Sequence, residues 1–413
     1  MSNFEHLYMS DRNILLHGPG GTGKSYDIQQ FIEYMKGLDE HVNFAYLAPT
    51  GTAASNISGL TIHSYFGLRM YTQFGSIEDE IIASINGARY ESNDLQLLII
   101  DEISMVGEKL LRIMDGILRK SYDVTKPMGG VRCIFSGDFY QLPPVKDDFC
   151  YNHNIWNELN FVVIPYTEQK RYTCERTFNL LMRLRENKLV ADDKKWLSDR
   201  VNAYRRGEHK VLEVKPVIIY TRNADVDALN QVEMSKLPTK LYKHTSENVF
   251  KTINKRHTLD IREQDKLLAD VIDKVCSLKV GANIMIYRNY DIPSKLTNGR
   301  LGIVLEINEE KKVIRIKLSD GLIHDIRPKE YEICGPGWRL SRTQYPLRPA
   351  WAITNYKCQG MTLDYAIMKL SECFTYGQVY TTIARVVSIE NIFIIDINFN
   401  RVKALSSLPF DNI

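Results

Sequence analysis

The sequence lacks a cysteine pairing pattern, a long hydrophobic run and a recognisable export signal. Its seven cysteines are scattered, with no CxxC pair and an odd total, which argues against a disulfide framework or a zinc site. No apolar stretch approaches the roughly 20 residues that cross a bilayer. The opening MSNFEHLYMSDRN has no basic-then-apolar pattern. We therefore expect an intracellular protein of a reducing compartment, cytoplasm or nucleus, with no membrane partner.

Charge is unevenly distributed along the chain. Residues 1–165 hold 12 of the 53 Lys and Arg but 20 of the 50 Asp and Glu, so this part has a net charge of −8 and the rest has +11. A basic C-terminal part suits a polyanionic partner, although on charge alone a lysine-rich solvated surface fits equally well. With 413 residues, the chain is long enough for two or three domains.

Short apolar strands alternate with helical stretches in the first third of the chain. Strands are predicted at 13–18, 42–49, 95–101 and 131–137, with a helix at 24–37. This alternation indicates a parallel α/β sheet with crossover helices. The more polar interval 67–93 is interpreted as an insertion at the edge of that sheet.

The second part of the chain is predicted to begin another α/β unit. A helical pattern covers 177–203, and a strand, turn and helix follow at 217–230. No element is assigned with confidence in the charged stretch 237–275. Short strands separated by NG (298–299) and DG (320–321) turns indicate a small antiparallel β module.

The stretch GPGGTGKS, residues 18–25, fits the pattern G-x-x-x-x-G-K-[ST] between a predicted strand and a predicted helix. Its glycines let backbone N–H groups turn towards phosphate oxygens. Lys24 is predicted to contact the β- and γ-phosphates, and the hydroxyl of Ser25 is predicted to bind Mg²⁺. A glycine-rich turn with an incidental lysine is the alternative, which this context disfavours. The residues predicted to hold the nucleotide are Gly18, Gly20, Gly21, Thr22, Gly23, Lys24 and Ser25.

An acidic pair follows a buried strand in LLIIDEISM, residues 97–105. Asp101 is predicted to hold Mg²⁺, and Glu102 to orient and deprotonate the attacking water. Acidic residues after strands are often helix caps, but together with the phosphate-loop pattern they predict hydrolysis of a nucleoside triphosphate.

An uncharged polar residue, Gln141, stands in FSGDFYQLPPV just after the strand at 131–137. Because parallel strands open on the same edge of a sheet, we expect Gln141 to hydrogen-bond the γ-phosphate or the attacking water. Pro143 and Pro144 fix their φ angles and stiffen the link that follows.

Seven stretches in order resemble superfamily 1 DNA helicases of the 5′-to-3′ branch, the RecD/Pif (petite integration frequency) type. They are HGPGGTGKS, APTGTAASNISGLTIHSYFGL, LLIIDEISMV, GGVRCIFSGDFYQLPPV, LKVGANIMIYRN with TNGRLGIV, PAWAITNYKCQGMTLD and GQVYTTIARVVS. The resemblance runs from about residue 12 to residue 398. It implies an α/β fold with two RecA-like P-loop NTPase domains, parallel sheets and a small inserted β-barrel-like module.

The resemblance also implies domain limits. The first RecA-like domain would cover 1–165, with a short insertion at 67–93 that helps to split the duplex. The second would cover 166–280 and 344–413, interrupted at 281–343 by a Src-homology-type barrel.

Site residues are implied by matching positions. Arg171 and Arg385 would reach the γ-phosphate from the second domain and stabilise charge during phosphoryl transfer. Gly360 would contact the nucleotide. The residues implied to bind DNA are Thr50, Thr52, His63, Lys357, Gln359 and Thr362. For Thr50 and Thr52, helix capping is a compatible second role.

Four aromatic residues are open to two interpretations: Tyr65, Phe66, Tyr287 and Trp351 either stack on bases or belong to the core. The match also has departures. Relatives usually carry a glutamine upstream of the P-loop that reads adenine, and none precedes the first predicted strand, so we expect relaxed base selectivity. Tyr356 and Cys358 stand where histidine and serine are common, which puts one DNA contact in doubt.

The sequence therefore predicts an ATP-dependent DNA helicase that moves 5′ to 3′ on single-stranded DNA, unwinds duplex junctions and functions as a monomer, with ATP and Mg²⁺ as cofactors. One alternative is a single-strand translocase or RNA helicase that unwinds DNA poorly. Another is a non-motor ATP-binding switch, which has no need of Glu102, Gln141 and two arginines together.

Overall fold

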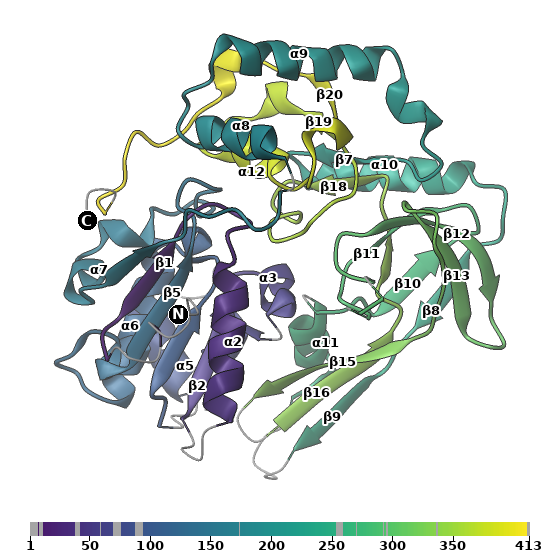
Figure 1. Cartoon of the computed structure of the whole chain (residues 1–413). Helices are drawn as coiled ribbons and strands as arrows, with labels where there is room; N and C mark the ends of the chain where they lie inside the picture. Colours follow the sequence, from purple (N-terminus) through teal and green to yellow (C-terminus); the bar gives the residue numbers. More distant parts are fainter. Residues whose placement is uncertain are drawn as a thin grey trace. The chain divides into compact units, whose positions relative to one another are not determined.

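The chain divides by its contacts into two compact units. The structure, a computed structural model, describes residues 7, 11–37, 42–57, 59–68, 76–86, 94–172, 174–252, 259–269, 271–291, 293–294, 296–335 and 338–410. Unit 1 comprises Met1–Arg171 and Leu405–Ile413, and unit 2 comprises Tyr172–Ala404 (Figure 1). No helix among these described ranges combines the length and the hydrophobicity of a membrane span.

Unit 1 is built on a six-stranded parallel sheet of order β3-β2-β4-β5-β1-β6. Its strands are β1 (Ile14–His17), β2 (Phe44–Ala48), β3 (Leu60–Thr61), β4 (Leu97–Ile100), β5 (Arg132–Gly137) and β6 (Val162–Pro165). Its helices are α2 (Lys24–Lys36), α3 (Gly51–Asn56), α4 (Ile62–Tyr65), α5 (Ile77–Asn86), α6 (Glu108–Ser121) and α7 (Asn154–Glu158). The predicted parallel α/β class is confirmed.

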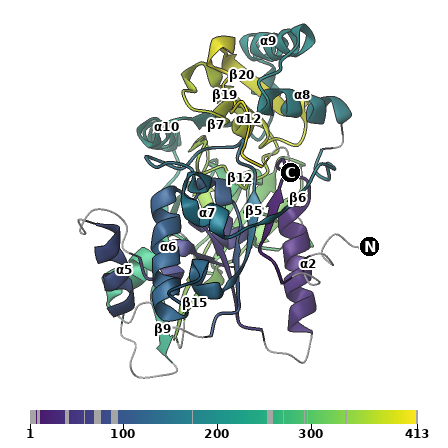
Figure 2. The same ribbon diagram turned by 90° about the vertical axis from the view of Figure 1, so that its left-hand side faces the viewer.

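Helices cover both faces of this sheet, which explains why the central strand β4 (LLII) is apolar at every position. Ile14 and Leu16 of β1 pack with Phe31 of α2, whereas Leu15, between them, packs on the opposite face with Met114 of α6. Figure 2 shows α2 and α6 on either side of the strands. The loops that follow the strands therefore emerge at one edge, where ligands bind in open α/β sheets.

The predicted insertion 67–93 contains one described helix, α5. Its Glu78 forms an ion pair with Lys120 of α6, and Ile81 packs against Gly116 of the same helix. Residues 69–75 and 87–93 lie outside the described part of the chain. The role of this insertion in splitting a duplex stays a prediction.

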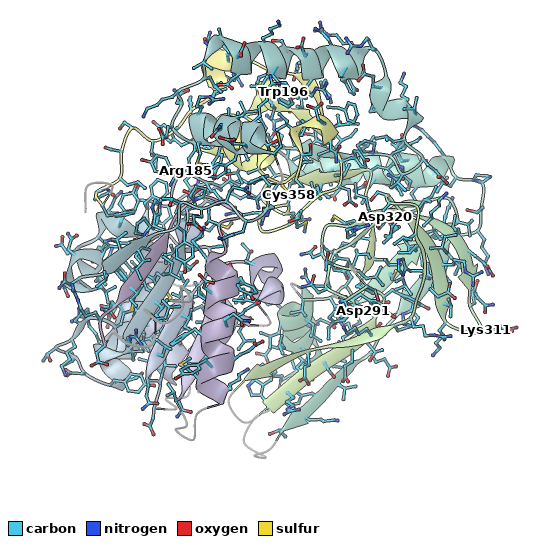
Figure 3. The ribbon with its side chains drawn as sticks, in the orientation of Figure 1. Arg185, Trp196, Asp291, Lys311, Asp320 and Cys358 are labelled. Carbon is cyan, nitrogen blue, oxygen red and sulfur yellow. The ribbon has the colours of Figure 1, made fainter. Side chains whose placement is uncertain are left out.

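Unit 2 contains a second parallel sheet, of order β18-β7-β19-β20. Its strands are β7 (Val217–Tyr220), β18 (Ala352–Thr354), β19 (Ala366–Lys369) and β20 (Ile392–Asp396). The helices around it are α8 (Glu175–Arg185), α9 (Ala191–Arg205), α10 (Asn223–Lys236) and α12 (Gln378–Ile383). Trp196 of α9 and Cys358, both labelled in Figure 3, belong to the core of this unit.

Three antiparallel sheets complete the described part of unit 2. The first has the order β14-β13-β12-β11-β17, the second β15-β16-β9, and the third β10-β8. Their strands are β8 (Tyr242–Thr245), β9 (Asn248–Thr252), β10 (Val275–Leu278), β11 (Asn283–Ile286), β12 (Leu301–Asn308), β13 (Val313–Leu318), β14 (Ile323–Ile326), β15 (Lys329–Gly335), β16 (Trp338–Gln344) and β17 (Leu347–Pro349).

The β module is thus antiparallel, and the DG turn joins β13 to β14, with the N–H of Leu318 donating to the carbonyl of Leu322 (2.8 Å). Strands β8 and β9 and helix α11 (Ile261–Ala269) come from the stretch in which the sequence predicts no element. A barrel-like shape for the module stays a prediction.

The C-terminal residues lie in a different unit from the one that the sequence assigns to them. Residues 405–413 belong to unit 1 by contact, and unit 2 begins at Tyr172 rather than at 166. The reason is hydrophobic burial, because Leu408 and Phe410 join the core of unit 1. A contact this distant in sequence leaves no local pattern.

Candidate nucleotide-binding site

The predicted phosphate loop connects the end of β1 to the start of α2. The N–H of Gly18 donates to the carbonyl of Gly137 at the end of β5 (3.2 Å). A Cβ at Gly18 would lie 2.1 Å from the carbonyl oxygen of Tyr166, so no other residue fits there. Gly21 and Gly23 have φ angles of 86° and 96°, in the left-handed region that favours glycine. The remaining members of the motif, Gly20 and Thr22, lie within the same loop.

Lys24 lies inside the curl of this loop. The residue is 8% exposed, and its Nζ donates to the carbonyls of Gly18 (2.7 Å) and Pro19 (2.8 Å). The hydroxyl of Thr22 also donates to the carbonyl of Pro19 (2.8 Å). The loop thus holds an ammonium group where loops of this pattern hold the phosphates of a nucleotide.

Ser25 and Asp101 meet across the sheet edge. The hydroxyl of Ser25 donates to Oδ2 of Asp101 at 2.6 Å, although 76 residues separate them, and Asp101 is 5% exposed. A hydroxyl and a carboxylate are the hard oxygen donors that Mg²⁺ prefers, so the pair fits the predicted metal ligands.

Glu102 has a left-handed backbone, with a φ of 53°. Its N–H donates to Oδ1 of Asp101 (2.9 Å), which ties the two acidic residues together. A non-glycine residue in this conformation costs about 1–3 kcal/mol and is concentrated at functional sites. The strain therefore agrees with a functional role for Glu102.

Tyr46 of β2 is a neighbour of this acidic pair that the sequence does not single out. Burial raises the pKa of Tyr46 well above its usual value, and the negative charges of Asp101 and Glu102 raise it further. The phenol therefore stays neutral. A tyrosine in a buried strand gives no motif signal, so its position was not predictable.

The loop after β5 is a tight turn organised by Asp138. Its carboxylate accepts from the N–H of Tyr140 (3.2 Å), and its carbonyl accepts from the N–H of Gln141 (2.9 Å). The side chain of Gln141 is 4% exposed. Because β5 lies between β4 and β1 in the sheet, the loops bearing Gln141, Asp101 and Lys24 emerge from adjacent strands.

Arg171 belongs to unit 1, so the expectation that both arginines come from the second domain is wrong for this residue. Its N–H donates to the carbonyl of Gly21 (3.1 Å), as does that of Lys170 (2.8 Å). The physical reason is the pairing of β6 with β1: parallel neighbours end at the same edge, so the segment after β6 passes the loop after β1.

The DNA-binding candidates of unit 1 follow β2 and β3. The hydroxyl of Thr50 accepts from the N–H of Ala53 (3.2 Å) at the start of α3, which confirms the capping role. Thr52 lies in α3, and its side chain is outside the described part of the structure. His63 is half-buried in the short helix α4. Their contact with DNA stays a prediction.

In unit 2 the structure brings together two motifs that the sequence treats separately. Gly299, of the NG turn, has a φ of 95°, and a Cβ there would lie 2.2 Å from the carbonyl oxygen of Thr362. Next to it, Arg300 pairs with Asp364 (3.2 Å). The TNGRLG turn therefore packs against the KCQGMTLD segment, in which Lys357 is exposed and Gln359 is buried.

Arg385 lies beside the same segment and is 2% exposed. Its Nε donates to the carbonyl of Thr381 (2.9 Å), and its carbonyl accepts from the N–H of Leu363 (2.8 Å). Burial raises the pKa of Cys358 to about 12, against the opposing positive charge of Arg385. Arg385 and Cys358 are thus neighbours in unit 2, and Gly360 lies in the same segment as Cys358.

Of the four aromatic residues, Phe66, Tyr287 and Trp351 are core residues. Arg348 lies over the Tyr287 ring at 3.8 Å from its centroid, Arg288 lies at 5.2 Å, and the Tyr287 hydroxyl accepts from the N–H of Asp273. These packed positions support the core interpretation for the three residues.

A parallel α/β sheet that ends in this loop, with Lys24 inside it and the Ser25–Asp101 pair beside it, defines a P-loop nucleotide-binding fold. Residues 6–210 match the family model described as PIF1-like helicase. The chain is 29% identical over 412 residues to ATP-dependent DNA helicase PIF1 of Xenopus laevis, with 96% of this chain and 61% of that protein covered.

Two solved structures of Pif1 helicases are also similar to this chain. Pif1 from Bacteroides sp in complex with ADP-AlF4 is 26% identical, with a TM-score of 0.75 and 97% of this chain and 92% of that chain covered. Bacteroides Pif1 bound to ssDNA is 25% identical, with a TM-score of 0.61 and 98% and 92% covered. The chain is therefore similar to PIF1-like helicases in sequence and in fold. It spans about 60% of the length of the curated relatives it matches.

Proposed function

We propose that the chain is an ATP-dependent DNA helicase that translocates 5′ to 3′ on single-stranded DNA and unwinds duplex junctions. The observation that carries the proposal is the Ser25–Asp101 hydrogen bond (2.6 Å) next to the buried Lys24. The name of the Xenopus laevis relative and the ADP-AlF4 and ssDNA complexes of Bacteroides Pif1 support it.

Nucleotide binding would begin at the phosphate loop. Backbone N–H groups of the loop and the ammonium of Lys24 would neutralise the β- and γ-phosphate oxygens. Ser25 and Asp101 would hold Mg²⁺, which neutralises charge on the phosphates when bound. Lys24 would exchange its present carbonyl partners for phosphate oxygens.

Hydrolysis would use the two polar groups beside this pair. Glu102 would orient the attacking water and accept its proton. Gln141 would hydrogen-bond the γ-phosphate or that water, and because it is uncharged it would not compete for Mg²⁺. Tyr46, held neutral, would limit repulsion next to the two carboxylates.

The arginines would stabilise the charge that develops during phosphoryl transfer. A guanidinium suits this role because it presents several donors and stays protonated. The backbone N–H of Arg171 is hydrogen-bonded to the phosphate loop of its own unit. Arg385 is held inside unit 2 beside the segment that contains Gly360. Turnover would therefore need both units.

DNA binding would use phosphate contacts, which position a strand without reading its sequence. The residues proposed for these contacts are Thr50, Thr52, His63, Lys357, Gln359 and Thr362. Because the KCQGMTLD segment carries Lys357 and packs beside Arg385, it would couple DNA binding to nucleotide hydrolysis. We further propose that a single chain suffices for this activity.

The test uses forked duplexes that carry only a 5′ or only a 3′ single-stranded tail, with and without ATP and Mg²⁺. Strand displacement from the 5′-tailed duplex alone, lost in Lys24→Ala, is the expected outcome. A preference for the 3′ tail would overturn the direction. ATP hydrolysis without displacement of either substrate would favour a translocase, and displacement of RNA duplexes alone would favour an RNA helicase.

A further inference from the structure

Phe410, near the end of the chain, is inserted into an aromatic cluster of unit 1. The residue is 6% exposed, and its ring meets the ring of His17 edge-on, with centroids 5.2 Å apart. It also contacts Phe139 (5.5 Å), Tyr151 (6.0 Å) and Trp156 of α7 (6.2 Å). In Figure 1 the yellow C-terminal segment ends close to α7.

Two members of this cluster lie at the loops of the nucleotide site. His17 is the last residue of β1 and directly precedes Gly18 of the phosphate loop. Phe139 lies between Asp138 and Gln141 in the loop after β5. The Phe410 ring therefore packs against the residue before the phosphate loop and against a residue of the loop after β5.

Asp138 links these contacts to Gln141. Nε2 of His17 lies 3.9 Å from Oδ1 of Asp138, which is fully buried, and the carbonyl of Asp138 accepts from the N–H of Gln141 (2.9 Å). A shift of His17 or Phe139 would thus move the turn that holds Gln141. Small displacements matter here, because a misplacement of about 1 Å can cost about 10²-fold in rate.

The path of the chain gives this contact a second consequence. The chain leaves unit 1 after Arg171 and returns to it at Leu405, so the two units are joined by two covalent connections. The first connection begins beside the phosphate loop, through the Arg171–Gly21 hydrogen bond. The second ends in the aromatic cluster, where Phe410 packs on His17 and Phe139.

We propose that Phe410 is a positioning residue for nucleotide hydrolysis, which anchors the returning chain and fixes His17, Phe139 and, through Asp138, Gln141. This inference rests on the proposed function, because it assigns Phe410 to the same hydrolytic site. It adds a residue that lies outside the sequence motifs. It also means that a displacement of the second connection between the units would shift the turn that holds Gln141.

The experiment compares the full-length chain with Phe410→Ala and Phe410→Tyr. Phe410→Ala is expected to lower the kcat of DNA-stimulated ATP hydrolysis about 10-fold or more, with the KM for ATP changed less than about twofold, since Lys24 and the phosphate loop stay in place. Phe410→Tyr, which keeps the ring, is expected to restore most of kcat.

A matched control separates positioning from stability. Phe161 packs on Phe135 (5.0 Å) and Trp156 (4.8 Å) in the same core but precedes β6, away from Gln141. Phe161→Ala should lower the melting temperature as Phe410→Ala does, with a near-normal kcat at temperatures where it is folded. If Phe410→Ala does not fold, Phe410→Leu, which keeps apolar volume without a ring, takes its place and should show the same loss.

The outcomes are distinguishable. A normal kcat in Phe410→Ala, or in Phe410→Leu where it replaces it, overturns the inference, as does an equal kcat loss in folded Phe161→Ala or the absence of rescue by Phe410→Tyr. No DNA-stimulated hydrolysis in the unmodified chain would instead contradict the proposed function.

Discussion

The two parallel sheets of this protein are alike in architecture but differ in the charged groups buried at their edges. Unit 1 buries the carboxylates of Asp101 and Asp138 together with the ammonium of Lys24, whereas unit 2 buries the guanidinium of Arg385. Burying a charge is costly unless it is paired or hydrogen-bonded, so each arrangement needs a reason. On the proposed function, unit 1 would hold the nucleotide with its metal ion and unit 2 would supply positive charge.

The charge balance of the sequence agrees with this division, since residues 1–165 have a net charge of −8 and the rest of the chain has +11. With the two groups of residues in different units, substitutions can affect nucleotide binding and nucleotide hydrolysis separately. Loss of the Lys24 ammonium in unit 1 should remove both ATP binding and turnover, whereas loss of Arg385 in unit 2 should remove turnover alone.

The largest effect is expected from Lys24→Ala. The substitution removes the ammonium from the phosphate loop, so ATP hydrolysis should fall by at least about 10³-fold. Steady-state ATPase measurements with single-stranded DNA check this, with Lys36→Ala at the exposed end of α2 as the control. Appreciable DNA-stimulated hydrolysis by Lys24→Ala would show that the phosphate site is elsewhere.

Arg385→Ala tests the contribution of unit 2. We expect nucleotide affinity to stay near normal while kcat falls about 10³-fold, on the scale of other arginines that act in phosphoryl transfer. Fluorescence titration gives the affinity and steady-state kinetics gives kcat. Arg401→Ala, at an exposed position of unit 2, is the control. An unchanged kcat would remove Arg385 from the mechanism and break the comparison between the units.

Gln141→Ala should have an intermediate effect. Loss of a hydrogen bond to the γ-phosphate or water should lower DNA-stimulated hydrolysis by about 10²-fold, and unwinding should fall in parallel. ATP binding should survive, and Gln30→Ala on the outer part of α2 serves as control. If unwinding fell while hydrolysis did not, Gln141 would act on the DNA side.

The smallest effect concerns thiol reactivity, in which an exposed cysteine of unit 2 is compared with the buried cysteines of unit 1. Cys174 of unit 2 is exposed, and backbone hydrogen bonds from Thr177 and Arg176 lower its pKa. The thiolate, which is the reactive form, therefore forms at lower pH than usual. Cys133 and Cys150 of unit 1 and Cys276, Cys358 and Cys373 of unit 2 are buried.

Brief treatment of the native protein with iodoacetamide, followed by mass spectrometry, should label Cys174 several-fold faster than the other described cysteines. The unit 1 thiols should stay unlabelled, because burial raises the pKa of each. Equal labelling of Cys133 would mean that the core of unit 1 opens. Cys174→Ser identifies the labelled peptide.

The site of unit 1 was predictable because its signals are local. The glycines before Lys24 and the carboxylates after a buried strand each combine with their neighbours in a short pattern, and parallel pairing then brings Ser25 to Asp101. The position of Gln141 followed in the same way from the end of a strand. Most strands of unit 1 were therefore located correctly from apolar runs.

The features that the sequence did not predict depend on contacts between residues far apart along the chain. Phe410 meets His17 across nearly the whole chain, and Arg171 reaches the phosphate loop through the β1–β6 pairing. Strands β8 and β9 were missed because they contain charged and polar residues and have no clear apolar pattern. Their backbone hydrogen bonds are made with β10 and β16, which lie further along the chain. None of these relationships leaves a pattern within a short window of sequence.

One measurement tests the central claim most directly: the kcat for ATP hydrolysis by the unmodified chain, alone and with single-stranded DNA or single-stranded RNA of matched length. A DNA-driven motor that divides binding and turnover between its units should hydrolyse ATP slowly alone and at least about 10-fold faster with DNA, as gated sites do when a partner completes them. The same low rate with and without DNA would contradict the account.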